Sequence, residues 1–267
     1  MSDGAGPERV LAAVYDAGVV AYHQHWAPAL HRHALALVEA LPGDRPRTIV
    51  DVGGGAGTLA SALRATAGPS GRVVVLDRSL GMLRRAPVEL PRVQADAARL
   101  PVADAAADVV VFAFVLFLLP DAAGAVAEAV RVLRPGGWLL AATWGRQRPT
   151  SADELVAAEL DRAGVPVFPA LPRSDELTDS PSRMTALLEG AGCTRVRTEN
   201  RPLDARFDPD SALALRTGSG ALGWRCAHLD EHARDAVHRR IAERLATLPP
   251  DAFVDRSEVL LAWARSP

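Results

Sequence analysis

Three glycines and an acid near residue 50 have the types and spacing of a ligand-binding turn. Asp51 ends an apolar run, and Gly53, Gly55 and Gly57 follow at alternate positions before a helical pattern begins. Glycine permits positive φ and leaves no side chain between a strand end and a ligand. The stretch 48–60, TIVDVGGGAGTLA, therefore predicts a strand, a tight turn and a helix, with a ligand close to the turn backbone.

The spacing of the glycines and the cation composition argue against a polyphosphate ligand. A dinucleotide fingerprint needs G-x-G-x-x-G, whereas this turn reads G-x-G-x-G, and Thr58 stands where the last glycine would be. A P-loop needs a lysine, but all 30 cationic residues of the chain are arginine. The absence of lysine also excludes Schiff-base and pyridoxal-phosphate chemistry.

Two further acids follow predicted strands. Asp77 ends the stretch 72–77, 20 residues after Gly57, where a carboxylate can accept both hydroxyls of a ribose. Asp96 ends the stretch 92–96, where an adenine amino group could find an acceptor. Together with the acid before the glycine turn, these carboxylates suit a nucleoside that carries positive charge, such as one with an S-adenosyl sulfonium.

Five motifs in order resemble one family, the S-adenosylmethionine-dependent methyltransferases with a Rossmann-like fold, in particular the small-molecule branch similar to ubiquinone-biosynthesis enzymes. They are VDVGGGAGTLA at 50–60, VVVLDRSLGML at 73–83, ADAARLP at 95–101, ADVVVFAFVLFLLPD at 107–121 and RVLRPGGWLLAATW at 131–144. The resemblance implies S-adenosyl-L-methionine as the cofactor and leaves the methyl acceptor open. It also implies an in-line displacement at the activated methyl group, in which positioning and exclusion of water do most of the catalysis.

The cofactor-binding residues expected from the motifs and the aromatic N-terminal segment are Tyr22, Asp51, Gly53, Gly55, Gly57, Asp77, Arg78, Asp96, Ala97 and Phe112. Related methyltransferases often carry a histidine where this chain has Phe117, which weakens the case for a base from that loop. The candidate catalytic base is instead His25, whose neighbour Trp26 falls on an apolar helical stripe. No metal site is expected, because histidines two apart, such as His23 and His25, point to roughly opposite sides of a helix.

The pattern of elements predicts an α/β fold, a doubly wound parallel sheet. Strands are expected near 48–52, 72–77, 92–96, 108–115, 137–144, 194–200 and 258–263, and helices near 58–67, 79–86, 121–134, 180–190 and 231–248. An N-terminal helical pair over 8–41, broken at Pro28, is expected to cap the core. A Ser151/Glu154 capping box predicts another helix start. The resembled fold has seven strands, mostly parallel, with helices on both faces and the last strand antiparallel.

The whole chain, 1–267, is expected to form a single methyltransferase domain: a helical cap over 1–45, a cofactor-binding core over 46–145, and a crossover, last strands and helical insertion over 146–267. The segments outside the core motifs are expected to carry acceptor specificity. These are the N-terminal helices, the crossover at 145–180 and the insertion at 207–250.

Composition limits which classes of substrate and which cellular compartment are expected for this protein. A formal charge of −2 and a pI near 6.4 give no basic field for nucleic acid, so a small-molecule acceptor is favoured. Two cysteines cannot form a disulfide framework, which favours the reducing cytoplasm. No apolar run reaches the roughly 20 residues of a membrane helix. The alternatives that remain are a methyltransferase scaffold turned to another reaction, such as a cyclisation, and a non-catalytic nucleoside-binding module.

Overall fold

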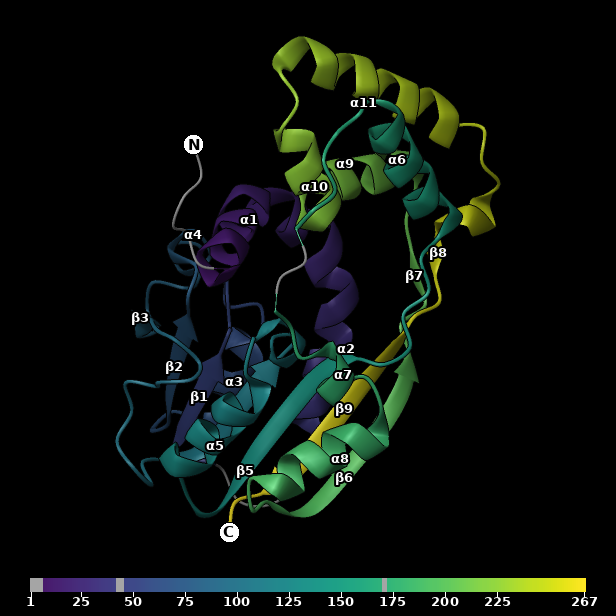
Figure 1. The fold of residues 1–267 in the computed structure, drawn as a ribbon. Coiled ribbons are helices and arrows are strands. Elements are labelled where there is room, and N and C mark those ends of the chain that lie inside the picture. The colour runs from purple at the N-terminus through teal and green to yellow at the C-terminus, as the bar shows by residue number, and fades with distance from the viewer. Residues whose placement is uncertain (1–6, 42–45, 170–171) are drawn as a thin grey trace. The chain divides into compact units, whose positions relative to one another are not determined.

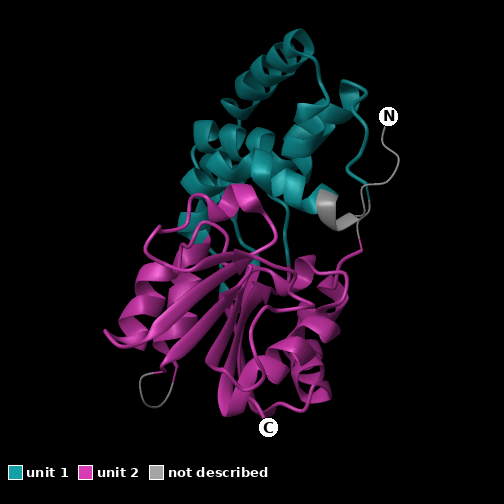
Figure 2. Ribbon diagram, turned by 90° about the vertical axis from the view of Figure 1, so that its left-hand side faces the viewer, with its two compact units in different colours: residues 1–29, 147–171, 202–257 teal, residues 30–146, 172–201, 258–267 magenta. Residues whose placement is uncertain are grey.

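The computed structural model describes residues 7–41, 46–169 and 172–267. Two compact units make up the chain, each assembled from separate stretches of sequence (Figure 2). Unit 1 contains residues 1–29, 147–171 and 202–257, and unit 2 contains residues 30–146, 172–201 and 258–267. No helix within the described ranges is long and apolar enough to cross a membrane.

Unit 2 is built on a seven-stranded sheet in the order β3-β2-β1-β4-β5-β9-β6 (Figure 1). The first five strands in sequence pair in parallel, and β9 runs antiparallel to β5. The predicted sheet is confirmed, and the order runs outward in both directions from β1 and β4, as in a doubly wound fold. The strands are β1 (Thr48–Val52), β2 (Arg72–Asp77), β3 (Arg92–Gln94), β4 (Ala107–Ala113), β5 (Leu133–Trp144), β6 (Thr194–Pro202) and β9 (Glu258–Arg265).

Helices pack around this sheet because its strands are apolar on both faces. Val50 and Val52 of β1 belong to one large buried cluster, together with Val126 of α5 and Leu188 of α8. The indole Nε1 of Trp263 in β9 donates a hydrogen bond of 3.0 Å to the carbonyl of Leu37 in α2, which ties that helix to the sheet. The helices around the sheet are α2 (Ala27–Glu39), α3 (Ala60–Ala67), α4 (Leu80–Leu83), η2 (Leu116–Leu118), α5 (Ala122–Val132), α7 (Asp175–Thr178) and α8 (Pro181–Gly190).

Unit 1 has its own helical core. Val237, Ile241 and Leu245 of α11 are buried in it, as their spacing predicts, and they pack with Leu155 and Leu160 of α6. The N-terminal helix, the crossover and the insertion thus meet in one unit although they lie far apart in sequence. Its elements are α1 (Pro7–Ala21), η1 (Tyr22–Trp26), α6 (Ser151–Arg162), β7 (Ala205–Arg206), α9 (Pro209–Gly218), α10 (Gly220–Ala227), α11 (Glu231–Leu245), η3 (Pro250–Phe253) and β8 (Val254–Asp255).

The predicted break of the N-terminal helix at Pro28 is wrong. α1, η1 and α2 form one continuous helical run, in which Tyr22–Trp26 is a π-helix and the N–H of Ala27 donates to the carbonyl of Tyr22, five residues back. Within an α-helix a proline ring collides with the carbonyl four residues earlier. The wider π-turn directly before Pro28 displaces these carbonyls and lets the helix continue. Residues 42–45 of the expected cap lie outside the described residues.

Two predicted boundaries also move. The cap of α6 is Thr150 rather than Ser151: its hydroxyl accepts from the N–H of Asp153 at 3.1 Å, and the Asp153 carboxylate accepts from the N–H of Thr150 at 2.8 Å. The fifth strand begins at Leu133, before the expected start at residue 137, and so includes the Pro-Gly-Gly stretch at 135–137. A register shift there accommodates the proline and Gly136, at φ +70°, as a bulge.

Three elements are shorter than expected. The third strand ends at Gln94, so Asp96 lies in the loop after it. The helix expected over 79–86 is the single turn α4, and α11 ends at Leu245. The short third strand and the single-turn α4, both in unit 2, leave more loop backbone next to the sheet, and functional residues concentrate in such loops.

Candidate cofactor site

The glycine turn after β1 has the predicted backbone conformation. Gly53, Gly55 and Gly57 have φ values of +69°, +55° and +71°. The carbonyl of Leu76 in β2 accepts hydrogen bonds from the N–H groups of Gly53 at 2.7 Å and Gly54 at 3.1 Å. The turn is therefore held against the carboxyl end of the neighbouring strand, the edge at which open α/β sheets bind ligands.

Most of these glycines are required by neighbouring protein atoms. A Cβ atom would come too close to another residue at three positions: 2.5 Å from Val115 at Gly53, 2.4 Å from Asp51 at Gly54, and 2.6 Å from Pro87 at Gly57. At Gly55 the nearest atom would be 3.4 Å away, an ordinary contact, so space alone does not demand glycine there. The pattern of alternate glycines does not include Gly54, and only its place in the unbroken run Gly53-Gly54-Gly55 could have indicated it.

Asp77 links the end of β2 to the glycine turn. Its Oδ2 accepts from the N–H of Gly55 at 2.9 Å, and its Oδ1 accepts from the N–H of Ser79 at 2.7 Å. The predicted ribose acceptor is thus brought directly to the turn. Ser79 in turn caps α4, since its hydroxyl accepts from the N–H of Met82 at 3.0 Å.

Arg78 and Asp96 form an ion pair between the ends of β2 and β3. The Arg78 Nη2 and the Asp96 Oδ2 are 2.7 Å apart, and the two side chains are 40% and 44% exposed. A pair this exposed contributes little stability, roughly 0–1 kcal/mol. Its effect is to position the loop: the other Asp96 oxygen accepts from the N–H of Ala98 at 3.0 Å, and Ala97 packs partly against the core.

Asp51 is a buried acid at this edge of the sheet. The residue is 1% exposed, and its Oδ1 has no hydrogen-bond partner among the described residues. Burial raises the pKa of its carboxyl to about 7, and the negative charge of Asp77 adds to the effect. A buried acid that lacks a partner is costly, and a positively charged ligand group would reduce that cost. The residues around the turn therefore fit a cationic cofactor.

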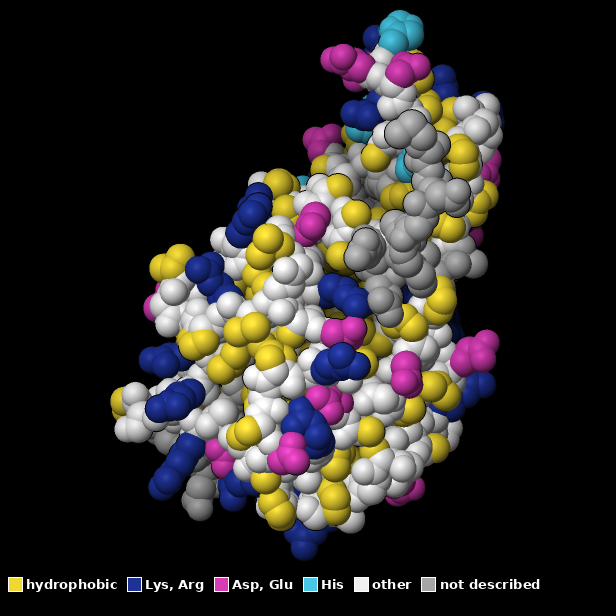
Figure 3. All heavy atoms as spheres, turned by 60° about the vertical axis from the view of Figure 1, so that its left-hand side comes forward, with side chains coloured by type: hydrophobic (Ala, Val, Ile, Leu, Met, Phe, Trp, Pro, Cys, Tyr) yellow, Lys and Arg dark blue, Asp and Glu magenta, His cyan; other side chains and the backbone are white. Residues whose placement is uncertain are grey.

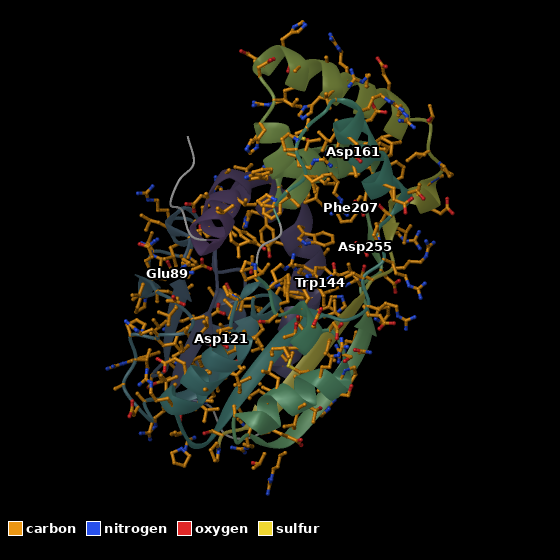
Figure 4. The ribbon with its side chains drawn as sticks, viewed as in Figure 1. Glu89, Asp121, Trp144, Asp161, Phe207 and Asp255 are labelled. Carbon is orange, nitrogen blue, oxygen red and sulfur yellow. The ribbon has the colours of Figure 1, made fainter. Side chains whose placement is uncertain are left out.

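Aromatic residues gather at the carboxyl ends of β4 and β5. Trp144, at the end of β5, is labelled in Figure 4. The centre of its ring lies 5.5 Å from that of Phe114 and 6.4 Å from that of Phe117. The guanidinium of Arg173 lies over Phe117, 5.2 Å from the ring centre. Phe112 is fully buried in the sheet core, so its side chain presents no exposed surface, and its role in cofactor binding stays a prediction.

Phe114 has an unusual backbone. Its φ is +59°, a left-handed conformation that bulky residues rarely adopt, and its N–H donates to the carbonyl of Ala142 at 2.7 Å. Such strain persists only where surrounding structure enforces it, and it clusters at functional sites. Phenylalanine carries no turn signal, so no local pattern could have indicated this position.

The remaining two predicted site residues belong to unit 1. Tyr22 and His25 lie in the π-helix η1 and are half-buried. The ring of Tyr22 meets that of Tyr15 edge-on at 6.0 Å, and Trp26 packs against Phe207 at 5.6 Å. π-turns occur frequently at functional sites. The other predicted residues lie in unit 2. No group of three or more potential metal ligands occurs among the residues described.

Comparison with known proteins agrees with this architecture. Residues 50–141 match the model of the methyltransferase domain family. A malonyl-[acyl-carrier protein] O-methyltransferase from Xylella fastidiosa is 34% identical over 167 residues, 57% of this chain and 55% of that protein. A ubiquinone/menaquinone biosynthesis C-methyltransferase from Stutzerimonas stutzeri is 36% identical over 127 residues, 44% of this chain and 47% of that protein. The chain thus spans about half the length of the curated relatives it matches.

Solved structures share the fold at low identity. The [4+2]-cyclase SpnF has a TM-score of 0.60 at 18% identity, with 99% of this chain and 98% of that chain covered. A phosphoethanolamine N-methyltransferase 2 from Haemonchus contortus, in complex with phosphomonomethylethanolamine and S-adenosylhomocysteine, has a TM-score of 0.58 at 17% identity, covering 100% of this chain and 61% of that one. Residues 50–141 are therefore similar to the methyltransferase domain family, and they lie within a sheet whose order the solved structures share as a fold.

Proposed function

We propose that this protein transfers a methyl group from S-adenosylmethionine to an oxygen, nitrogen or carbon of a small-molecule acceptor in the biosynthesis of a metabolite. The observation that carries the proposal is the group of carboxylates at the ends of β1 and β2. Asp51 is buried without a hydrogen-bond partner on Oδ1 among the described residues, and Asp77 contacts the turn at Gly55. An acidic edge beside a glycine turn matches a cationic nucleoside and opposes a diphosphate.

Each residue at this edge would have a distinct task. S-adenosylmethionine, when bound, supplies an activated methyl group with a good leaving group. Asp77, held by two backbone N–H groups, would orient the ribose, and the loop fixed by the Arg78–Asp96 pair would lie against the adenine. Asp51 would compensate positive charge. Catalysis would then rest on holding the acceptor in line with the methyl group and on excluding water.

The acceptor is proposed to be small. The two curated relatives are named for acting on malonyl-acyl carrier protein and in quinone biosynthesis, and the chain matches both only in part. The formal charge is −2, and basic and acidic side chains are interspersed on the face shown in Figure 3. The charge supports a small acceptor over nucleic acid, and neither relative is named for acting on nucleic acid. Cys193 and Cys226 are buried and free, which supports a reducing compartment, the cytoplasm.

His25 remains the proposed base for an acceptor that must lose a proton. The half-buried π-turn position lets an imidazole contact a substrate and still exchange protons with water. With an identified acceptor, His25→Ala is expected to lower kcat by about 10²-fold and change the pH profile while cofactor affinity stays constant. An unchanged profile would remove the residue from the mechanism.

Calorimetry with S-adenosylhomocysteine and NAD tests the cofactor assignment. The wild-type protein is expected to bind the first and not the second. Asp77→Ala is expected to weaken binding about ten- to a hundredfold, because it removes a charge-assisted hydrogen bond worth about 1.5–3 kcal/mol. Asp77→Asn keeps one oxygen for the Gly55 N–H, so its affinity for S-adenosylhomocysteine should lie between those of wild type and Asp77→Ala. Asp121→Ala is the matched control: this acid caps α5 through the Gly124 N–H at 2.8 Å and should leave affinity unchanged.

Loss of affinity in the control as well as in Asp77→Ala would mean that the substitutions act through the fold. Equal affinity of wild type and Asp77→Ala for S-adenosylhomocysteine would contradict the proposed site. Binding of NAD would contradict the choice of cofactor.

A further inference from the structure

Asp51 lies in an apolar setting on three sides. In the sheet its neighbours in register are Val75 of β2 and Val111 of β4. Above it, a Cβ on Gly54 would come within 2.4 Å of Asp51 Oδ2 and 2.9 Å of Val75. The carboxyl group is therefore enclosed by the turn that is proposed to hold the cofactor, and its Oδ1 finds no partner among the described residues.

On the neighbouring strand β2, the charged side chain that affects Asp51 is Asp77. Its negative charge repels a negative charge on the Asp51 carboxyl and so raises the pKa of that group. β4 contributes the uncharged Val111 on the other side. α3 follows the turn, and its charged residue Arg64 donates to the carbonyl of Gly71 at 3.4 Å. Among the described residues no cation contacts the Asp51 carboxyl, so its charged form is opposed by burial and by a like charge.

We propose, on the basis of the function proposed above, that Asp51 holds a proton in the ligand-free protein and releases it when the positively charged cofactor binds, so that cofactor binding is coupled to pH. The physical reason is that a cation beside the carboxyl favours the charged form, whereas the empty site favours the neutral form. Proton release and ligand binding then favour each other.

The direction of the pH effect follows from the ligand-free carboxyl. Burial and Asp77 raise its pKa to about 7, so about half of the molecules carry the proton at that pH. Below pH 7 the ligand must displace a proton from most molecules, and affinity is expected to fall about tenfold per pH unit. Above pH 8 the carboxyl is charged before binding, and affinity should be constant.

Calorimetry of S-adenosylmethionine binding to the full chain, from pH 5.5 to 8.5, with the measurement near pH 7 made in both phosphate and Tris, counts the proton directly. The two buffers differ in ionisation enthalpy, so a released proton makes the observed binding enthalpy depend on the buffer. The wild-type protein is expected to release about half a proton at pH 7. Asp51→Asn cannot release one, so it should bind more weakly at pH 8 with no proton step. Subtracting the number of protons released by Asp51→Asn from the number released by wild type removes the contribution of any proton that the ligand itself exchanges with the solvent.

Asp77→Asn gives a second, independent readout. Removal of the like charge should lower the pH midpoint of the proton step without abolishing it. Asp121→Asn, on α5 of the same unit, should leave both midpoint and affinity as in wild type.

The outcomes are distinct. Binding of S-adenosylmethionine with the same pH dependence in wild type and Asp51→Asn would overturn the proton coupling and leave the proposed function standing. Absence of binding at every pH would overturn both proposals. A proton step present in wild type, absent in Asp51→Asn and moved to lower pH in Asp77→Asn would establish the coupling.

Discussion

At the residue scale, Phe114 combines a strained backbone with good ring packing. Its φ of +59° costs a side-chain-bearing residue about 1–2 kcal/mol, while its buried ring packs against Trp144 at 5.5 Å. Gly53, across from the adjoining Val115, has no room for a Cβ, so the path of this loop is set by the glycine turn. The strain at the end of β4 and the shape of the turn are thus parts of one arrangement.

We expect Phe114→Gly to be more stable than Phe114→Ala by about 1 kcal/mol, although glycine is ordinarily the less stabilising of the two. Both variants lose the ring, which costs about 3–5 kcal/mol, but only glycine accepts positive φ without strain. Urea unfolding of the three proteins measures the difference. Ala125→Gly, in the middle of α5, is the control: there the glycine variant should be less stable than the wild type, which carries alanine. An alanine variant as stable as the glycine variant would show that the loop relaxes.

Asp51 is also expected to make stability depend on pH. Its carboxyl has a pKa raised from 3.8 to about 7, so between these values the native protein binds more protons than the unfolded chain. The stability that the native state gains from binding this proton is therefore fully present below pH 4 and is lost as the pH rises to about 7. The upper limit of the loss in the free energy of unfolding is about 4 kcal/mol. Asp51→Asn should be more stable than wild type at pH 8, with less difference at pH 5, in thermal unfolding without ligand. A constant difference across this range would contradict the raised pKa.

At the element scale, one buried acid joins two helices of unit 1. The Glu159 side chain on α6 is fully buried, and Arg240 and Arg244 of α11 and Arg162 of its own helix contact its carboxylate. Burial raises the pKa of Glu159, but hydrogen bonds from Arg244 and Arg240 outweigh it, so the net change is downward. The carboxylate is thus stabilised in its charged form, and the polar contacts add to the apolar packing between α6 and α11.

Glu159→Gln is expected to destabilise unit 1 by about 1–3 kcal/mol, because hydrogen bonds to a charged buried acceptor are lost. Hydrogen exchange should accelerate in 151–162 and 231–245 more than in β1 and β4. Glu199→Gln is the control: this residue pairs with Arg197 and Arg201 on β6 but is 32% exposed, and its loss should cost less than about 1 kcal/mol. Equal losses of stability from both substitutions would show that the buried ion pairs of Glu159 stabilise the protein no more than the exposed pairs of Glu199.

At the scale of the whole molecule, the two tasks of the proposed transferase are expected to fall in separate compact units. Unit 2 contains the glycine turn and its carboxylates, and unit 1 gathers the segments to which acceptor specificity is assigned. The single-domain organisation over 1–267 stays a prediction. Each unit has a buried apolar cluster of its own, so each can respond separately to a ligand.

Hydrogen exchange with and without ligands tests this division. S-adenosylhomocysteine alone is expected to slow exchange in 48–60 and 76–83, because the turn and the Asp77 loop would hold it. Further protection in 7–29, 147–169 and 202–257 is expected only when an acceptor is added. Asp77→Ala, at the same ligand concentration, should lose the first effect. Protection confined to unit 2 in the presence of both ligands would contradict the assignment of specificity to unit 1.

Local spacing determined much of this protein: the glycine turn, the acids at or just after the ends of three strands, and the strands of the sheet. Such features depend on neighbouring residues, whose backbone preferences and side-chain alternation can be interpreted directly. Tertiary structure alone decided that Gly54 must lack a Cβ above Asp51, that Phe114 is forced into positive φ, and that the helix continues through Pro28 after a π-turn. It also decided that the crossover and the insertion, which lie far apart in the chain, share one core. These features arise from contacts between residues far apart in the chain, and close packing, rather than local propensity, selects among the conformations that each segment allows.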